Sequence, residues 1–204
     1  MIAVMPKCKP NIRNAAKEAA HERIVAAAAR AIRRSGYEGT GVANIMKEAG
    51  LTHGAFYAHF ESREAMLVEA VDRAFAESNA VAQSVTAAVP ASQSLYAVIQ
   101  AYLSKAHMES IETGCPVSAL GSEMPRQSQA VRRVSTRKIQ EMVEHVTQQI
   151  PNSGQHSTHE RALVIVATMV GALMLARAVD DPFLADALRN ATLKSLTHAA
   201  VEAD

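Results

Sequence analysis

Residues 49–60 read AGLTHGAFYAHF and lie where two short helical patterns meet. Before this turn, Thr40 is placed to cap a helix that Gly50 ends. After it, Thr52 is placed to cap a second helix that runs to about His59. Two short helices joined by so tight a turn indicate a helix-turn-helix, whose second helix enters the major groove of DNA while the first lies across the backbone.

The rest of the chain also follows helical spacing, and no run of alternating apolar and polar residues predicts a strand. Besides the two short helices, we expect helices over about 19–35, 62–90, 94–113, 126–150, 157–179 and from 182 onward. Ser157 with Glu160 forms a capping box, and Asp181-Pro182 provides a cap followed by proline at the first helical position. The predicted fold class is all-α, with about nine helices.

The composition fits this prediction and excludes other classes. Hydrophobic residues make up 49% and charged residues 20%, which is ordinary for a globular protein and excludes a disordered or fibrous chain. No apolar run approaches the ~20 residues that span a bilayer, and residues 1–17 lack the apolar core of a signal peptide. We therefore expect a cytoplasmic protein without a membrane partner. Cys8 and Cys115 are too few for a disulfide framework or a four-thiolate zinc site.

Positive charge concentrates toward the N-terminus. Residues 1–64 contain ten Lys or Arg against six Asp or Glu, whereas residues 65–204 contain eleven against fourteen. A basic N-terminal part on a mildly acidic body is typical of a protein that binds a polyanion. Residues 1–17 are expected to form a flexible basic tail, which either follows DNA phosphates or stays solvated.

Residues on both sides of the opening stretch complete a longer pattern. Gly36-Tyr37 and Thr40 precede it, and residues 62–64 (Ser-Arg-Glu) follow it. Over about residues 22–69, the pattern resembles the DNA-binding head of the TetR (tetracycline-repressor-like) family. The resemblance implies a dimeric transcriptional repressor that a small effector releases from a palindromic, double-stranded DNA operator.

The resemblance also divides the chain after the tail. It implies a helix-turn-helix DNA-binding domain over residues 18–64 and a helical effector-binding and dimerisation domain over 65–204. Two positions depart from the family pattern. Gly41 stands where a second Ser or Thr is usual, and Arg63 replaces the commoner Lys, which keeps the charge but changes its geometry.

The candidate DNA-binding residues are the polar and small residues of this pattern. They are Thr40, Thr52, His53, Gly54, Ala55, Tyr57, His59 and Arg63. The first turn of the second helix brings donors and small groups to base edges, and Gly54 lets the backbone approach DNA. The resemblance implies phosphate contacts from Tyr57, His59 and Arg63. Thr40 offers a hydroxyl and nearby amides to a phosphate, because helix N-termini bind anions.

Other residues have simpler interpretations. Phe56 and Phe60, four residues apart, are expected to face the core. The two histidines of the motif are solvated surface imidazoles if the protein does not bind DNA, and the chain is then a helical ligand-binding or scaffolding protein. His156 and His159 form an H-x-x-H pair that capping and solvation explain, so we predict no metal and no cofactor. No nucleophile elbow, phosphate loop or paired carboxylates predict an enzyme.

The C-terminal helices suggest a homodimer. The helix over 157–179 is apolar around most of its circumference, so it needs cover from two sides. We expect the last two helices to pair with those of a second copy. The expected effector is small and hydrophobic, because the long helices around the predicted pocket carry mostly apolar residues. The candidate pocket residues are Tyr102, Leu103, Met142, Val146, Met169 and Leu173.

Cys115 is the other candidate effector position. It lies at a helix break, where the start of the next helix favours a thiolate, and the turn resembles one that some family members use to sense oxidants or electrophiles. Such an electrophilic effector is the alternative to a hydrophobic one. Cys115 is equally interpretable as a buried, inert residue that packs as a small hydrophobe. Spacing alone does not make His107 its catalytic partner.

Overall fold

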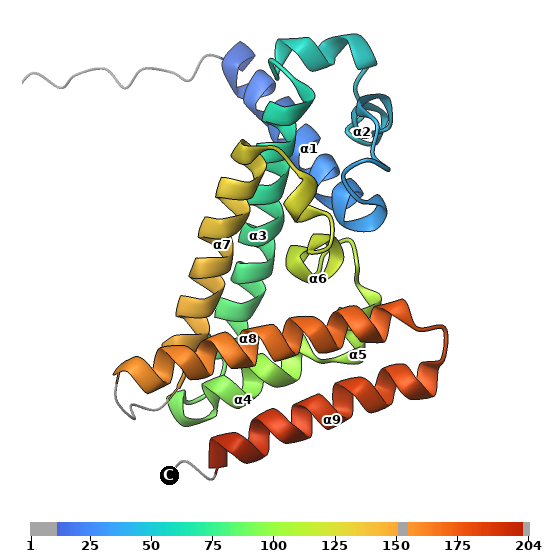
Figure 1. Ribbon diagram of the computed structural model, residues 1–204. Helices are drawn as coiled ribbons and strands as arrows, with labels where there is room; N and C mark the ends of the chain where they lie inside the picture. Colours follow the sequence, from blue (N-terminus) through green and yellow to red (C-terminus); the bar gives the residue numbers. More distant parts are fainter. Residues whose placement is uncertain (1–11, 151–154, 202–204) are drawn as a thin grey trace, which may run out of the picture.

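The structure is a computed structural model that describes the backbone of residues 12–150 and 155–201 and the side chains of 14–150 and 158–197. Over these residues it holds nine α-helices and two short 3₁₀ helices, with no strand (Figure 1). They are α1 (Ile12–Ser35), α2 (Val42–Glu48), η1 (His53–Ala58), α3 (Arg63–Ala87), α4 (Ala91–Tyr102), α5 (Lys105–Glu109), α6 (Pro116–Leu120), η2 (Met124–Arg126), α7 (Gln129–Thr147), α8 (Gln155–Ala178) and α9 (Pro182–Val201). The all-α prediction is confirmed.

The helices form a small head on a larger body. Figure 1 shows α1, α2 and η1 together at one end, while α3 runs from this head into the body with α7 alongside it. At the far end, α8 and α9 lie side by side as an antiparallel pair next to α4. The long α3 is therefore a continuous connection between the two parts.

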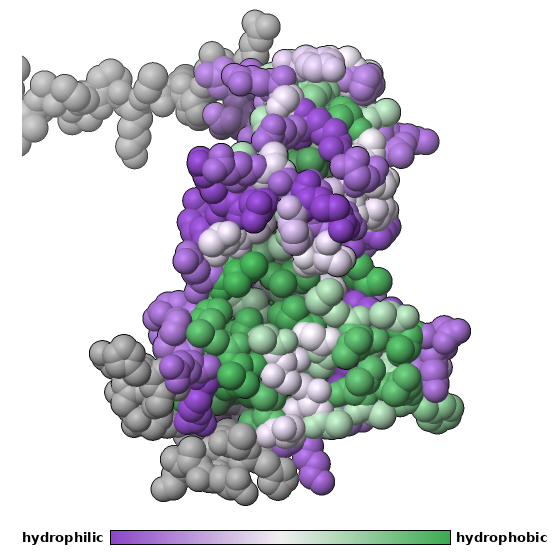
Figure 2. Space-filling model, viewed as in Figure 1, coloured by the Kyte–Doolittle hydropathy of each residue, from purple (hydrophilic) through white to green (hydrophobic). Residues whose placement is uncertain are grey.

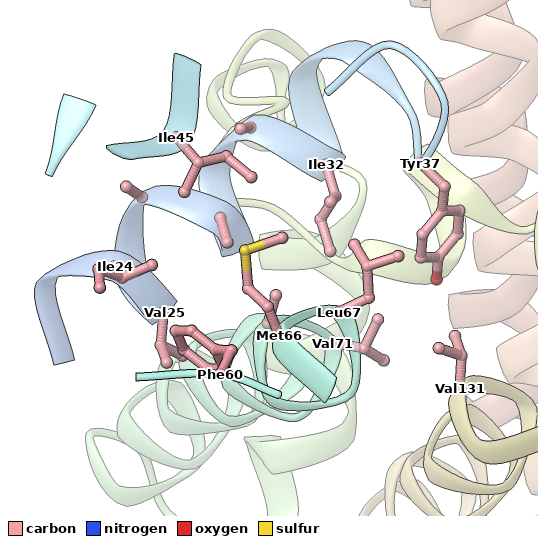
Figure 3. Packing of buried hydrophobic residues seen from close by; sticks show 14 of the residues in the cluster. Ile24, Val25, Ile32, Tyr37, Ile45, Phe60, Met66, Leu67, Val71 and Val131 are labelled. Atoms are coloured by element: carbon pink, nitrogen blue, oxygen red, sulfur yellow. The ribbon is translucent and has the colours of Figure 1, made fainter. Parts of the chain in front are cut away.

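One apolar core joins the head to the body. Ile24, Ile45 and Met66, from α1, α2 and α3, are completely buried in it. Figure 3 shows their side chains pointing into one shared space, with Tyr37 on the side nearest α7. Val131 of α7 belongs to the same buried cluster. The head is thus packed against α7 as well as joined to the body through α3.

Two glycines end the first two helices as the sequence predicts. Gly36 follows α1 with φ +74°, and Gly50 follows the Ala49 C-cap of α2 with φ +71°. Only glycine adopts this left-handed conformation without strain, so both turns depend on the missing side chain.

The start of α2 differs from the prediction. Gly41 is the N-cap residue, and Thr40 is not. The Thr40 hydroxyl lies 2.9 Å from the carbonyl oxygen of Gly36 and 3.1 Å from that of Ala31, so it bonds to the end of α1 instead. α1 itself begins at Ile12, well before the expected residue 19, and the helix after Thr52 is 3₁₀ rather than α.

The single helix predicted over 94–113 is wrong. The chain breaks between α4 and α5, and the Ser104 hydroxyl caps α5 by accepting from the His107 amide at 3.1 Å. Arg189 of α9 donates to the Leu103 carbonyl at 2.6 Å, at the point where the helix ends. The apolar spacing continues across the break because Leu103 is still buried, so the pattern alone gave no sign of it.

The last two helices are close to prediction, with one correction. α8 begins at Gln155, so Ser157 does not precede it as a cap, whereas Asp181 caps α9 by accepting from the Phe183 amide at 2.8 Å. By length and composition alone, the segment Thr158–Ala178, with mean hydropathy 1.7, could cross a membrane. The expectation that no apolar run approaches this length is therefore wrong. A core helix meets the same criterion, and α8 packs against α6, α7 and α9.

Candidate functional site

The exposed residues of η1 form the tip of the head. Thr52, His53 and Gly54 are exposed, and the Tyr57 side chain is 73% exposed. Ala55 is half-buried. Beneath them Phe56 and Phe60 are buried and stacked, with ring centroids 5.5 Å apart, as their spacing predicts. An apolar foundation therefore supports a polar outer surface.

Gly54 leaves open space at this tip. A Cβ atom built on it meets nothing within 4 Å, and its φ does not require glycine. The fold therefore has no need of glycine here, unlike at Gly50. What the absent side chain permits is close approach of another molecule to the η1 backbone.

Two of the predicted phosphate-binding side chains are occupied inside the head. The Arg63 guanidinium donates to the carbonyl oxygen of Tyr37 and lies 3.5 Å from that of Thr40. Thr40 is only 4% exposed, and its hydroxyl is bonded as described above. The expectation that the Thr40 hydroxyl contacts a phosphate is therefore corrected. Both side chains hold the loop between α1 and α2.

His59 lies half-buried beside positively charged residues of α1. Its Nδ1 atom is buried without a hydrogen-bond partner. Burial lowers the pKa of His59, and the nearby charges of His21, Lys17 and Arg23 lower it further. The imidazole is therefore neutral at pH 7, and Lys17 and Arg23 carry the positive charge at this corner. The predicted helix began at about residue 19, which left Lys17 in the tail, and Arg23 was not among the candidate DNA-binding residues.

A cavity of about 340 Å³ lies in the body. Five predicted residues line it: Tyr102, Cys115, Met142, Val146 and Met169. Leu103 and Leu173 do not line it, and both are buried in the core. The wall also contains residues that were not predicted, namely Phe75, Val81 and Val85 of α3 and the histidines His107 and His145. The spacing of apolar residues in the sequence predicted the apolar stripe of α3. It did not predict that this stripe lies next to the cavity, because that depends on contacts between residues far apart in the sequence.

His107 connects two parts of the cavity wall. Its Nδ1 lies 2.7 Å from the Tyr102 carbonyl oxygen, and its Nε2 accepts from the Cys115 amide at 3.0 Å. These partners require a neutral ring with its proton on Nδ1. Burial lowers the pKa of His107, which agrees with that form. His107 and Cys115 are therefore neighbours through the backbone amide, while the Cys115 residue is only 1% exposed.

Arg177 of α8 holds the same wall from behind. Its guanidinium donates to the Ser118 hydroxyl at 2.8 Å and to the carbonyl oxygens of His107 and Met108 at 2.7 and 3.1 Å. All three acceptors are uncharged. Among the described residues, no carboxylate lies within ion-pair distance of Arg177. Burial lowers the pKa of Arg177, since desolvation disfavours its charge.

Two arginines of α1 bind the segment that leads into Cys115. The buried Arg33 pairs with Glu77 of α3 and donates to the Gly114 carbonyl oxygen. The exposed Arg34 pairs with both Glu48 of α2 and Glu112. The head is therefore connected to the cavity wall by hydrogen bonds and ion pairs as well as by apolar packing.

A helix-turn-helix with an exposed second helix, mounted on a helical body, defines a DNA-binding transcriptional regulator of the helix-turn-helix class. Two family models match the chain. The one described as bacterial regulatory proteins of the tetR family covers residues 24–70. The one described as the C-terminal domain of LmrA/YxaF-like transcriptional regulators covers residues 90–191. The chain belongs to the TetR family, whose members are regulators and not enzymes.

Relatives span most of the chain. The HTH-type transcriptional regulator LmrA of Bacillus subtilis is 28% identical over 162 residues, 76% of this chain and 84% of its own. An uncharacterised HTH-type transcriptional regulator of Mycobacterium tuberculosis is 29% identical over 171 residues, 78% and 85% of the two chains.

Solved structures share the fold. Reduced NemR of E. coli superposes with a TM-score of 0.74 at 19% identity, covering 88% of this chain and 95% of its own. A TetR transcriptional regulator from Chloroflexus aurantiacus gives 0.73 at 26% identity, covering 91% and 96%.

Proposed function

We propose that this TetR-family protein is a cytoplasmic repressor that binds a palindromic operator as a homodimer. A small, largely apolar molecule in the body cavity releases it from DNA. The observation that carries the DNA-binding role is the exposed row formed by the N-cap residue Thr52 and by His53, Gly54 and Tyr57 of η1, supported by the buried Phe56. The small and polar side chains of this row can reach and hydrogen-bond to base edges in the major groove.

The exposed residues divide into two roles. Thr52, at the N-cap of η1, and His53, in its first turn, reach base edges together with Ala55, while Tyr57 contacts a phosphate. His59, which is neutral, hydrogen-bonds to a phosphate oxygen instead of pairing with it as a cation. Arg63 and Thr40 position the loop before α2, and the Arg63 charge still attracts the DNA backbone.

The dimer surface follows from exposed apolar residues on the last two helices. Leu163, Val164 and Leu175 of α8 are 46%, 62% and 55% exposed, and Phe183 of α9 is 86% exposed. Figure 2 shows apolar residues gathered over the body, below a hydrophilic head. A patch of this kind on a soluble protein marks an interaction site. A two-fold pair of these helices would set two heads on half-sites about 34–36 Å apart, or at a longer spacing.

Release requires that the effector binds the DNA-free arrangement more tightly than the DNA-bound one, since otherwise it shifts no equilibrium. The contacts of Arg33 and Arg34 with residues 112–114 support this coupling, because the cavity wall is bonded to the head. A movement of that wall should therefore displace α1 and α2 through these contacts.

Selection of binding sites from random DNA duplexes tests the function. We expect an enriched sequence with two-fold symmetry. Tyr57→Phe should weaken binding to all sequences alike, whereas His53→Ala should change which sequence is preferred. Tyr96→Phe, at an exposed position on α4 in the body, serves as the matched control for Tyr57→Phe. If no sequence is enriched, the chain is a helical ligand-binding or scaffolding protein.

A second sensing mode uses Cys115 as an electrophile or redox sensor. The observation that favours it is that Cys115 lines the cavity, so a reactive molecule held there reaches the thiol. Its burial favours a packing role instead. Cys115→Ser discriminates the two. If this variant still releases operator DNA with peroxide and with a reactive quinone as the parent does, Cys115 is a packing residue.

A further inference from the structure

The cavity wall carries no formal charge among its described residues. Apolar side chains of α3, α4, α7 and α8 form most of it, and none of the lining residues is Asp, Glu, Lys or Arg. A cationic ligand would lose its hydration here and find no carboxylate to replace it. The apolar part of a ligand is accommodated by residues such as Phe75, Val98 and Met169.

Several polar side chains also line the cavity, and one cluster of them has a positive charge behind it. Tyr102, His107 and Cys115 contact one another there, with the Tyr102 and His107 rings 4.7 Å apart. Arg177 bonds to the His107 carbonyl and to Ser118, and its charge acts on Tyr102 and Cys115. Because its acceptors are uncharged, that charge is not neutralised within this cluster. A low-dielectric surrounding strengthens its attraction for a negative group.

Tyr102 provides an unused hydrogen-bond donor in the same cluster. Its hydroxyl oxygen is buried and has no hydrogen-bond partner, although the side chains of Cys115 and Ser118 lie beside it. Burial raises the pKa of Tyr102 well above its ordinary value, so the group remains a protonated phenol that can donate. An unpaired buried hydroxyl is unfavourable, and a ligand oxygen that accepts from it removes this cost.

We infer that the cavity binds a molecule with an apolar body and one anionic or hydrogen-bond-accepting oxygen group, which lies at Tyr102 in front of Arg177, and that it rejects cations of the same shape. The inference deepens the proposed function by naming the effector class. Only its consequence at the operator rests on that function, because binding is measurable on the protein alone.

Three probes with the same bicyclic aromatic body test it: naphthoate, naphthylmethanol and naphthylmethylammonium. Calorimetric titration of the full chain without DNA should rank them in that order. We expect naphthoate to bind at least about tenfold more tightly than the ammonium compound. If the ammonium compound binds as tightly as naphthoate, or if none of the three binds, the inference is wrong.

Two variants separate the hydroxyl from the charge. Tyr102→Phe should reduce naphthoate affinity about tenfold, leave the affinity for naphthalene unchanged and not lower the melting temperature, because the lost hydroxyl has no partner in the protein. Tyr96→Phe, on α4 away from the cavity lining, is the matched control. If Tyr102→Phe binds naphthoate as the parent does, the inference is overturned.

Arg177→Gln should reduce the preference for naphthoate over the ammonium compound, while Arg177→Lys should retain most of it. Arg177 also bonds to α5. If the Gln variant does not fold for this reason, the preference for naphthoate over the ammonium compound is measured on the Lys variant. An unchanged preference in a folded Gln variant, or a preference lost in a folded Lys variant, contradicts the role of the charge. An operator-release assay is kept separate. If naphthoate binds as expected but releases no DNA, the ligand class holds and the effector role fails.

Discussion

The guanidinium of Arg33 donates to the carbonyl oxygen of Gly114 at 3.3 Å, although 81 positions separate the two residues in sequence. Arg33 is completely enclosed, and it also donates to the Ala74 carbonyl and pairs with Glu77. Gly114 lies on the cavity wall. One side chain of the first helix of the head is thus bonded directly to the wall of the cavity.

Arg33→Met should therefore be strongly destabilising. The substitution removes the hydrogen bonds to the carbonyl oxygens of Ala29, Ala74 and Gly114 and leaves Glu77 with only Arg73, and we expect a loss of about 3 kcal/mol in the free energy of unfolding. Arg34→Met is the matched control. Its side chain is 42% exposed, so its two ion pairs should contribute at most about 1 kcal/mol. Urea denaturation measures both, and equal losses would contradict this interpretation.

The two glycines around the turn should respond differently to the same substitution. Gly54→Ala meets open space and should leave the melting temperature almost unchanged, but its methyl group faces the approaching DNA and should weaken operator binding. Gly50→Ala places an alanine at φ +71° and should cost about 1–2 kcal/mol of stability. Thermal melting and operator titration of both variants test this. Full DNA affinity in Gly54→Ala would show that the position is not at the interface.

Stability should fall as the solution becomes mildly acidic. Burial lowers the pKa of His107 in the folded protein below the 6.5 of a free histidine, so the unfolded chain binds its proton first. The contribution of the neutral ring is complete above pH 6.5 and is lost as the pH falls from 6.5 toward the folded value. Denaturation at several pH values should show a smaller dependence in His107→Asn. Part of the pH dependence should remain in this variant, because burial also lowers the pKa of His59 and His145. An unchanged slope would contradict this assignment.

Charges placed on the last two helices should separate the dimer. Leu175→Glu and Phe183→Glu, each at an exposed apolar position, should convert a dimer into a monomer by light scattering at micromolar concentration and abolish tight operator binding. Tyr96→Glu, 49% exposed on α4, should remain dimeric. A monomeric parent protein would exclude the dimer outright.

Local signals in the sequence predicted much of the head. The spacing of Phe56 and Phe60 and the glycines at positions 36 and 50 depend on a few neighbouring residues, and all four lie as expected. Thr40 is different. A threonine before a helix satisfies the capping pattern, but the hydroxyl bonds to the end of α1, and only the packed loop decides between these partners.

The cavity was predicted less completely, because its wall depends on contacts between distant residues. The break at Leu103 follows from Ser104, a cap inside an uninterrupted apolar stripe, and from Arg189 of α9. Nothing near Arg177 in the sequence indicates that it binds the His107 and Met108 carbonyls about 70 residues earlier. Apolar periodicity shows that a side chain faces inward, but it does not show whether a core or a cavity lies there.

The short helix α5 buries none of its residues completely. It is retained by its Ser104 cap and by the bonds from Arg177 to the His107 and Met108 carbonyls, which involve little apolar area. A segment attached in this way opens at a small fraction of the free energy of global unfolding. Its amide protons should therefore exchange with deuterium sooner than those of α3 or α8. Local opening of α5 would let a small molecule enter the cavity from this side.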